Sequence, residues 1–155
     1  MCGILLRSSD NEIEFTEFVA AMRRQDHRGP DDQRIIWRNS DGSVHECDVR
    51  QKSVVFDRGV RTVIGHSRLS ILDLTSASNQ PMLSDRNEYA LAFNGCIYNY
   101  REIRSELEQV GVMCQSTGDT EVLFKALMYW GPDAIKKLNG MWAFVFYDIS
   151  NDLIH

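Results

Sequence analysis

The chain of 155 residues is 43% hydrophobic and 25% charged, which is typical of one soluble globular domain. Its formal net charge of −5 arises from interspersed acids and bases without a basic run, which argues against nucleic-acid and anionic-membrane partners. The longest strongly apolar run, residues 141–147, is far shorter than the roughly 20 residues of a membrane-spanning helix, and no signal peptide is visible.

The four cysteines are Cys2, Cys47, Cys96 and Cys114, and no two of them form a Cys-x-x-Cys pair. This spacing disfavours a zinc site or a thioredoxin motif, so we expect no metal. Nothing in the sequence indicates a secreted disulfide scaffold either. We therefore expect a reduced protein in the cytoplasm.

The first half of the chain predicts strands around one helix. Apolar residues within 15–22 recur at i, i+3, i+4 and i+7, which is one face of a helix. The polar segment 27–32 is typical of a loop, and residues 39–42 are typical of a turn. Strands are expected at residues 2–6, 33–37, 44–49, 54–56 and 61–66.

The second half mixes strands and helices. Residues 76–84 are expected to form a loop, and 89–93 a strand that ends at Asn94 and Gly95. Asn99 and Glu102 have the spacing of a capping box, which predicts the start of a helix. We expect a strand at 112–116, a helix at 119–130, a strand at 141–148 and a turn at 150–152 leading into 153–155. Because the chain stops inside this hairpin, we interpret it as a fragment.

Cys2 carries the first chemical signal. Removal of Met1 would leave a thiol and a free α-amine on the same residue. An α-amine has an unperturbed pKa of about 7.7–8.0, so it can act as a base toward its own thiol. The alternative is that Cys2 is a small buried residue of the first strand.

Five further residues each allow two readings. Arg68 can grip a carboxylate with two parallel hydrogen bonds, or it is a surface arginine. The Asn94 side chain and the Gly95 N–H can together stabilise an oxyanion, or the pair forms a hairpin turn. Asp119 can face a substrate ammonium, or it caps a helix. His27 can be a general base, or it is structural.

Eight short motifs occur along the whole chain in a specific series. They are Met-Cys-Gly-Ile at 1–4, His-Arg-Gly-Pro-Asp-Asp at 27–32, Gly-His-Ser-Arg-Leu-Ser-Ile-Leu-Asp at 65–73, Gln-Pro-Met at 80–82, Phe-Asn-Gly at 93–95, Ile-Tyr-Asn-Tyr at 97–100, Gly-Asp-Thr-Glu at 118–121 and Leu-Asn-Gly-Met-Trp-Ala at 138–143. Their order and spacing resemble the class II glutamine amidotransferases, most closely the amino-terminal glutaminase domain of asparagine synthetases.

The resemblance implies an α+β fold, the four-layer αββα sandwich of the N-terminal nucleophile hydrolases with two antiparallel sheets, truncated at its C-terminal end. Residues 1–155 would form one incomplete glutamine amidotransferase type 2 domain, with the synthetase domain absent. The resemblance also implies roles. Cys2 is the nucleophile, Asn94 and Gly95 form the oxyanion hole, Arg68 binds the α-carboxylate of glutamine, and Asp119 binds its α-ammonium.

The implied reaction is the hydrolysis of glutamine to glutamate and ammonia through a thioester on Cys2. In full-length members the ammonia reaches a synthetase domain that uses ATP, so ATP and magnesium are expected only there and no cofactor in this chain. No Ser-Gly-Gly-x-Asp-Ser loop or Walker sequence occurs in the chain, in agreement with that expectation. A homodimer is left open.

Two positions depart from the family pattern. Cys96 stands where the family has a glutamate that helps to bind the substrate ammonium, and Asn79 stands where a glycine is usual. Asn tolerates a left-handed backbone, so the second change costs little. The first change leaves a second function open, a catalytically degenerate amidotransferase domain that serves as a ligand-binding or assembly module.

Overall fold

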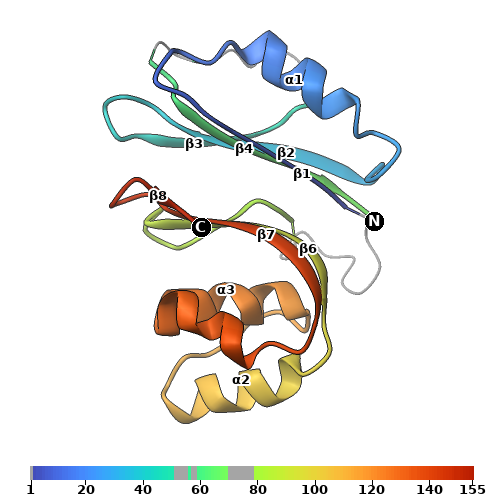
Figure 1. Ribbon diagram of the computed structural model, residues 1–155, viewed down its shortest axis with the longest axis vertical. Coiled ribbons are helices and arrows are strands. Elements are labelled where there is room, and N and C mark those ends of the chain that lie inside the picture. The colour runs from blue at the N-terminus through green and yellow to red at the C-terminus, as the bar shows by residue number, and fades with distance from the viewer. Residues whose placement is uncertain (1, 51–55, 57–58, 70–78) are drawn as a thin grey trace.

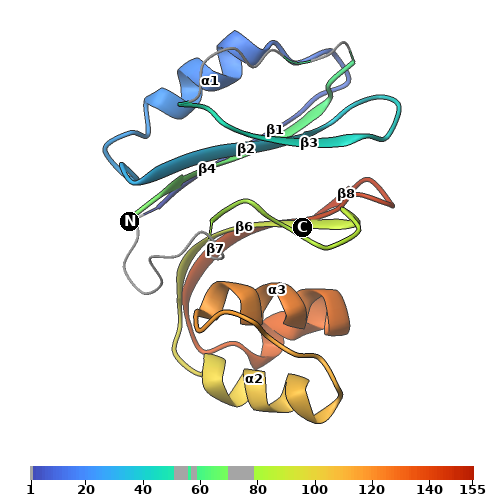
Figure 2. The ribbon, with the colours of Figure 1, turned by 180° about the vertical axis from the view of Figure 1, so that it is seen from behind.

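The computed structural model describes residues 2–50, 56, 59–69 and 79–155. Two antiparallel sheets lie face to face, and each has helices on its outer side, so the protein has four layers (Figures 1 and 2). The expected αββα sandwich is therefore confirmed. No helix in the described part of the chain is long and apolar enough to cross a membrane.

The first sheet has the strand order β1-β4-β2-β3, and every neighbouring pair is antiparallel. Its strands are β1 (Gly3–Ser8), β2 (Asp32–Arg38), β3 (Val44–Asp48) and β4 (Thr62–Arg68). Helix α1 (Phe15–Arg23) covers the outer face, as its apolar spacing predicted. The central strand β4 is buried along its whole length, because strands flank it on both edges and other layers cover both faces.

The second sheet has the order β5-β6-β7-β8 and is also antiparallel. It consists of β5 (Met82–Leu83), β6 (Tyr89–Ile97), β7 (Gly140–Asp148) and β8 (Leu153–Ile154). Its outer face is covered by α2 (Tyr100–Gln109), α3 (Asp119–Trp130) and the 3₁₀ helix η2 (Gly131–Lys137). β6 and β7 curve strongly beside the start of β1, so the N-terminus lies at this end of the sandwich (Figures 1 and 2).

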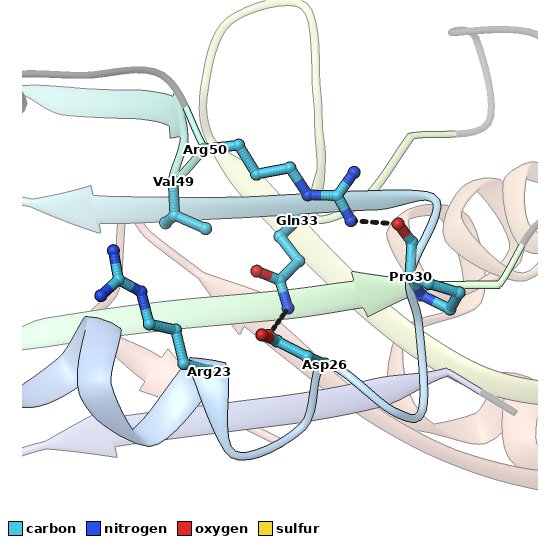
Figure 3. Close-up of a pocket in the computed structure, with 6 residues that line it drawn as sticks. All are labelled: Arg23, Asp26, Pro30, Gln33, Val49 and Arg50. Atoms are coloured by element: carbon cyan, nitrogen blue, oxygen red, sulfur yellow. Dashed lines mark hydrogen bonds between the residues drawn. The ribbon is translucent and has the colours of Figure 1, made fainter.

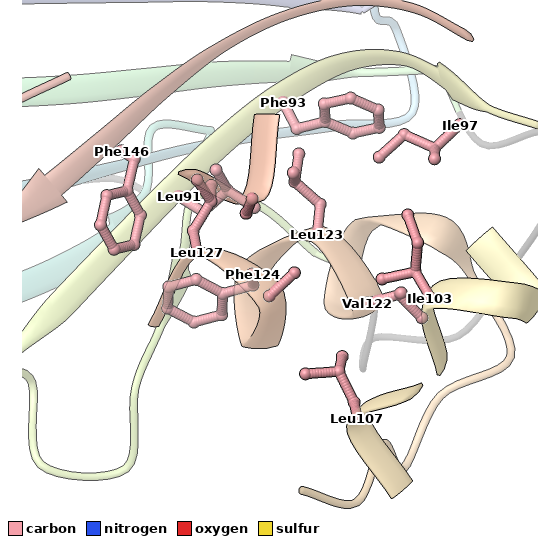
Figure 4. Packing of buried hydrophobic residues seen from close by; sticks show 12 residues of the cluster. Leu91, Phe93, Ile97, Ile103, Leu107, Val122, Leu123, Phe124, Leu127 and Phe146 are labelled. Carbon is pink, nitrogen blue, oxygen red and sulfur yellow. The ribbon is translucent and has the colours of Figure 1, made fainter. Parts of the chain in front are cut away.

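Side-chain alternation assigns each strand residue to a layer. Ala90 and Ala92 of β6 pack between the two sheets, whereas Leu91 and Phe93 pack against the helices α2 and α3. Figure 4 shows this second group meeting side chains of the two helices, Leu123 among them. The apolar groups in the three interfaces hold the layers together.

Several predicted elements are confirmed within one or two residues, among them α3, β7 and the hairpin that leads into β8. Residues 76–78 of the loop predicted at 76–84 lie outside the described residues, and the prediction is wrong at 82–83, because β5 pairs there with β6. The helix η2 was not predicted. Residues 54 and 55 of one predicted strand lie outside the described residues.

The strand predicted at 112–116 is wrong, and a carboxylate explains why. The backbone N–H groups of Gln115 and Ser116 donate to Glu121 of α3 instead of to a neighbouring strand. The capping box is wrong for a similar reason. Asn99 makes no cap, because its side chain donates to Lys137 O and accepts from Asn139 N.

Candidate active site

Cys2 and Arg68 lie side by side at one end of the first sheet. Gly3 pairs with Ser67, so the preceding residue Cys2 meets Arg68 at the next step of the two strands. The N–H of Leu69 lies 3.4 Å from Cys2 Sγ. Cys2 is half-buried, whereas Arg68 is only 7% exposed, so the reading of Arg68 as a surface arginine is wrong.

Both side chains face the second sheet. Ile4 and Ile64 pack in the core between the sheets. Since side chains alternate along a strand, Cys2 shares the face of Ile4, and Arg68 shares the face of Ile64. The thiol and the guanidinium therefore point into the space between the layers.

Asn94 reaches the same space from the opposite sheet. It follows Ala92, an inter-sheet core residue, by two positions, and Cys96 follows Asn94 by two. β6 contacts both β1 and β4. One hydrogen bond sets the alignment, because His66 Nε2 on β4 lies 3.0 Å from Phe93 O on β6. Beyond this hydrogen bond, toward the end of the sandwich where the N-terminus lies, β4 reaches Arg68 and β6 reaches Asn94.

Gly95 lies inside β6 and not in a turn. Asn94 and Gly95 pair with Ala143 and Trp142 of β7, so the hairpin-turn reading is wrong and the strand extends beyond its predicted end. A Cβ atom on Gly95 would lie 2.3 Å from Met141 O. Glycine is therefore required by the close approach of β7, and it leaves this point of the strand without a side chain.

Asp119 closes the far end of β6. It is the first residue of α3, is 5% exposed, and its Oδ2 accepts a 2.9 Å hydrogen bond from Ile97 N. Gly118 holds the N-cap position without a side-chain cap, so the N-cap reading of Asp119 is wrong. Burial raises the pKa of Asp119, against the bond from Ile97, which lowers it. The structure thus places a buried carboxyl next to Cys96 along the strand.

The loop at 27–32 supports this end of the first sheet. A Cβ atom on Gly29 would lie 2.2 Å from the carbonyl carbon of Ser67, so only glycine allows the loop to pack on the backbone before Arg68. Arg28 Nε donates to Cys2 O at 3.2 Å. His27 is exposed on the loop. The motif therefore acts through its backbone and Arg28.

An open pocket of about 310 Å³ lies behind this loop. In Figure 3 the guanidinium of Arg50 is directed at Pro30 O, and Gln33 at the carboxylate of Asp26, with Nε2 to Oδ1 at 2.7 Å. It is lined by Arg23, Asp26, Pro30, Gln33, Val49 and Arg50. None of the predicted site residues is among them. The pocket lies where the side chains of Gln33 and Arg50 hold the loop in place by hydrogen bonds.

Three further polar residues lie near the predicted set; Asn79 was noted only as a departure from the family pattern, and His66 and Gln80 were not singled out in the sequence. Asn79 Oδ1 accepts from Arg68 Nη1 at 2.6 Å. Gln80 Oε1 accepts from Phe93 N at 2.6 Å, and His66 binds the carbonyl of the same residue. His66 and Gln80 each lie in one of the eight motifs, which was the signal available for them.

The arrangement of two facing antiparallel sheets within four layers is that of the N-terminal nucleophile hydrolases. The glutamine phosphoribosylpyrophosphate amidotransferase of Bacillus subtilis has the same fold, with a TM-score of 0.72 and 22% identity over 96% of this chain and 35% of that chain. The chain also matches the glutamine amidotransferase domain family over residues 1–154, and it belongs to that family.

Its relatives include glutamine-hydrolysing asparagine synthetases. Asparagine synthetase 1 of Bacillus subtilis is 34% identical over all of this chain and 22% of its own length. The putative asparagine synthetase 2 of Methanocaldococcus jannaschii is 32% identical over 99% of this chain and 29% of its own length. The chain thus spans less than a third of these relatives.

Proposed function

We propose that this domain hydrolyses glutamine to glutamate and ammonia through a thioester on Cys2. The observation that carries the proposal is the meeting of Cys2, the buried Arg68 and Asn94 in one space between the sheets. A thiol nucleophile, a cation for a carboxylate and an amide donor for an oxyanion are the groups that this reaction needs. The family membership supports the same activity.

The reaction begins after removal of Met1. The Cys2 amine takes the thiol proton, and the thiolate attacks the side-chain amide carbon of glutamine. The Asn94 amide and the Gly95 N–H stabilise the oxyanion of the tetrahedral intermediate. The amine then returns its proton to the leaving nitrogen, ammonia departs and a thioester remains. Water, deprotonated by the same amine, attacks the thioester and releases glutamate and the thiol.

Glutamine is held by its two α-substituents in this proposal. Arg68 binds the α-carboxylate with parallel hydrogen bonds, because its guanidinium presents donors in a planar fork. Asp119 and the polar surface at Cys96 take the α-ammonium. The ammonia passes to a synthetase domain that activates an acceptor carboxylate with ATP, a partner suggested by the relatives named as glutamine-hydrolysing asparagine synthetases.

A second candidate is a degenerate domain that binds a ligand without turnover. Cys96 favours it, because a cysteine cannot supply the charge of the glutamate common in the family. The presence of Cys2, Arg68, Asn94, Gly95 and Asp119 favours the enzyme, and we prefer that reading.

Labelling with a glutamine-like electrophile separates the two candidates. We expect one adduct, mapped by mass spectrometry to Cys2, together with release of glutamate and ammonia from glutamine. Cys2→Ser should keep the fold and lose both, because a hydroxyl is far harder to ionise than a thiol. Glutamine binding without any adduct or turnover would support the degenerate module. An active preparation that retains Met1 would contradict the role of the free amine.

A further inference from the structure

Both main-chain polar groups of Phe93 are bound by side chains. Within the described part of the chain, β5 pairs with β6 only at Leu91 and Ala90, so no described strand covers the edge of β6 at Phe93. There Gln80 Oε1 accepts from Phe93 N at 2.6 Å, and His66 Nε2 donates to Phe93 O at 3.0 Å. These two side chains make the hydrogen bonds that a neighbouring strand would otherwise make with Phe93.

The direction of the Gly95 N–H follows from this edge. In an antiparallel ladder, successive residues direct their N–H and C=O groups to opposite edges, so every second residue faces the same edge. Phe93 and Ile97 both direct their N–H groups away from β7, to Gln80 and to Asp119. Gly95 lies midway between them, so its N–H points to the same edge, between two anchored positions.

The two clamping side chains are buried and come from separate parts of the chain. His66 has no exposed surface and Gln80 is 5% exposed. Because a carbonyl only accepts, His66 Nε2 carries the proton, and Nδ1 has no partner among the described residues. Burial lowers the pKa of His66 to about 4, so the ring is neutral near pH 7 and the same donor is always present.

From this geometry we infer that His66 and Gln80 are positioning residues that fix the oxyanion donors Asn94 and Gly95 through the main chain of Phe93. The inference rests on the proposed function, and it assigns a task to His66 and Gln80, two motif residues that the reaction itself does not use. Neither side chain touches the reacting atoms. Each acts by holding Phe93, the residue that precedes Asn94 on β6.

The test compares variants that remove and retain these bonds. His66→Leu removes the donor, His66→Gln retains one at a similar reach, and Gln80→Met removes the acceptor. We expect the first and third to lower kcat for glutamine about 10- to 100-fold, less than the 10²–10³-fold loss of a donor itself. KM should change by less than about two-fold, because a displaced oxyanion donor affects the transition state. His66→Gln should recover most of the rate.

A matched control separates positioning from stability. The control variant is Ile64→Val. Ile64 lies two residues before His66 on the same face of β4 and does not bind Phe93. The variant should lower stability and leave kcat of the folded fraction unchanged. If His66→Leu fails to fold, then His66→Gln and Gln80→Met decide. A kcat equal to that of the unaltered chain in Gln80→Met would overturn the inference.

Two further measurements keep the outcomes distinct. In an Asn94→Ala background, Gln80→Met should lower kcat by clearly less than it does alone, and an undiminished loss there would contradict action through Asn94. Amide exchange of Phe93 should be faster in Gln80→Met than in the unaltered chain, and unchanged exchange would overturn the clamp itself. An inactive unaltered chain with that faster exchange refutes the proposed function and the catalytic part of the inference, but not the clamp.

Discussion

Arg68 Nη1 donates a 2.6 Å hydrogen bond to Asn79 Oδ1. The residue that departs from the family's glycine thus contacts the arginine proposed to bind the substrate carboxylate. This hydrogen bond helps to orient the planar guanidinium fork that the proposed function assigns to the substrate carboxylate. The next residue, Gln80, binds β6, so a single dipeptide links the two faces of the site.

Asn79→Gly should raise KM for glutamine about 3- to 10-fold and leave kcat about the same. The reason is that loss of a hydrogen bond worth about 1 kcal/mol leaves the guanidinium less well ordered, and substrate binding must then order it again. Steady-state kinetics measures both constants. Asn79→Asp is the control, and it should raise KM further, because its carboxylate competes for Arg68. A lower KM in Asn79→Gly would mean that Asn79 blocks the carboxylate.

Asn94→Ala should lower kcat by roughly 10²–10³-fold with little change in KM, because the amide acts on charge that develops in the transition state. Asn99→Ala is the matched control. Its side chain binds Lys137 O and Asn139 N, outside the proposed site, so it should lower stability and keep kcat. If Asn94→Ala behaves like Asn99→Ala, then Asn94 is a structural residue.

Cys96→Glu should lower KM for glutamine by about 10- to 100-fold and keep kcat. A charged hydrogen bond contributes about 1.5–3 kcal/mol. The ammonium does not change during the reaction, so it is bound equally in the ground state and in the transition state. The Cys96→Gln side chain has the same shape as that of Cys96→Glu without the charge, and we expect it to lower KM much less. An unchanged KM in Cys96→Glu would place Cys96 away from the ammonium and favour the degenerate module.

Glu121→Gln should lower the free energy of unfolding by about 1–3 kcal/mol near neutral pH. Burial raises the pKa of Glu121, but the N–H groups of Gln115 and Ser116 outweigh it, so the pKa is lowered from 4.5. A lowered folded pKa gives stability that is present above pH 4.5 and is lost as the pH falls through the folded pKa.

Denaturant unfolding at pH 7 and pH 3 measures this difference. The difference in the free energy of unfolding between Glu121→Gln and the unaltered chain should be smaller at pH 3 than at pH 7. Glu106→Gln is the control, because Glu106 forms an exposed ion pair with Lys137, and such pairs contribute about 0–1 kcal/mol. A gap that is the same at both pH values would show that the carboxylate charge does not hold the segment.

Local patterns in the sequence determined the α-helices and the strongest strands. The bounds of α3 follow from a stripe that Gly131 and Pro132 end, and α1 follows from apolar residues at helical spacing. These signals are contained within a few turns of chain, so they need no knowledge of distant residues. The eight motifs likewise indicated the family, and the match over residues 1–154 confirmed it.

Tertiary structure alone decided how the candidate site is assembled. Cys2 directly precedes β1, whereas Arg68 and Asn94 lie in β4 and β6. The direction in which each side chain points depends on how the two sheets are stacked. The end of β6 was misjudged because Asn94 and Gly95 carry a turn signal that pairing with β7 overrides. Residues 112–116 were misjudged because a carboxylate satisfied donors that a strand would otherwise pair. Backbone groups bind whichever acceptor the packed layers bring near, and a local pattern does not contain that information.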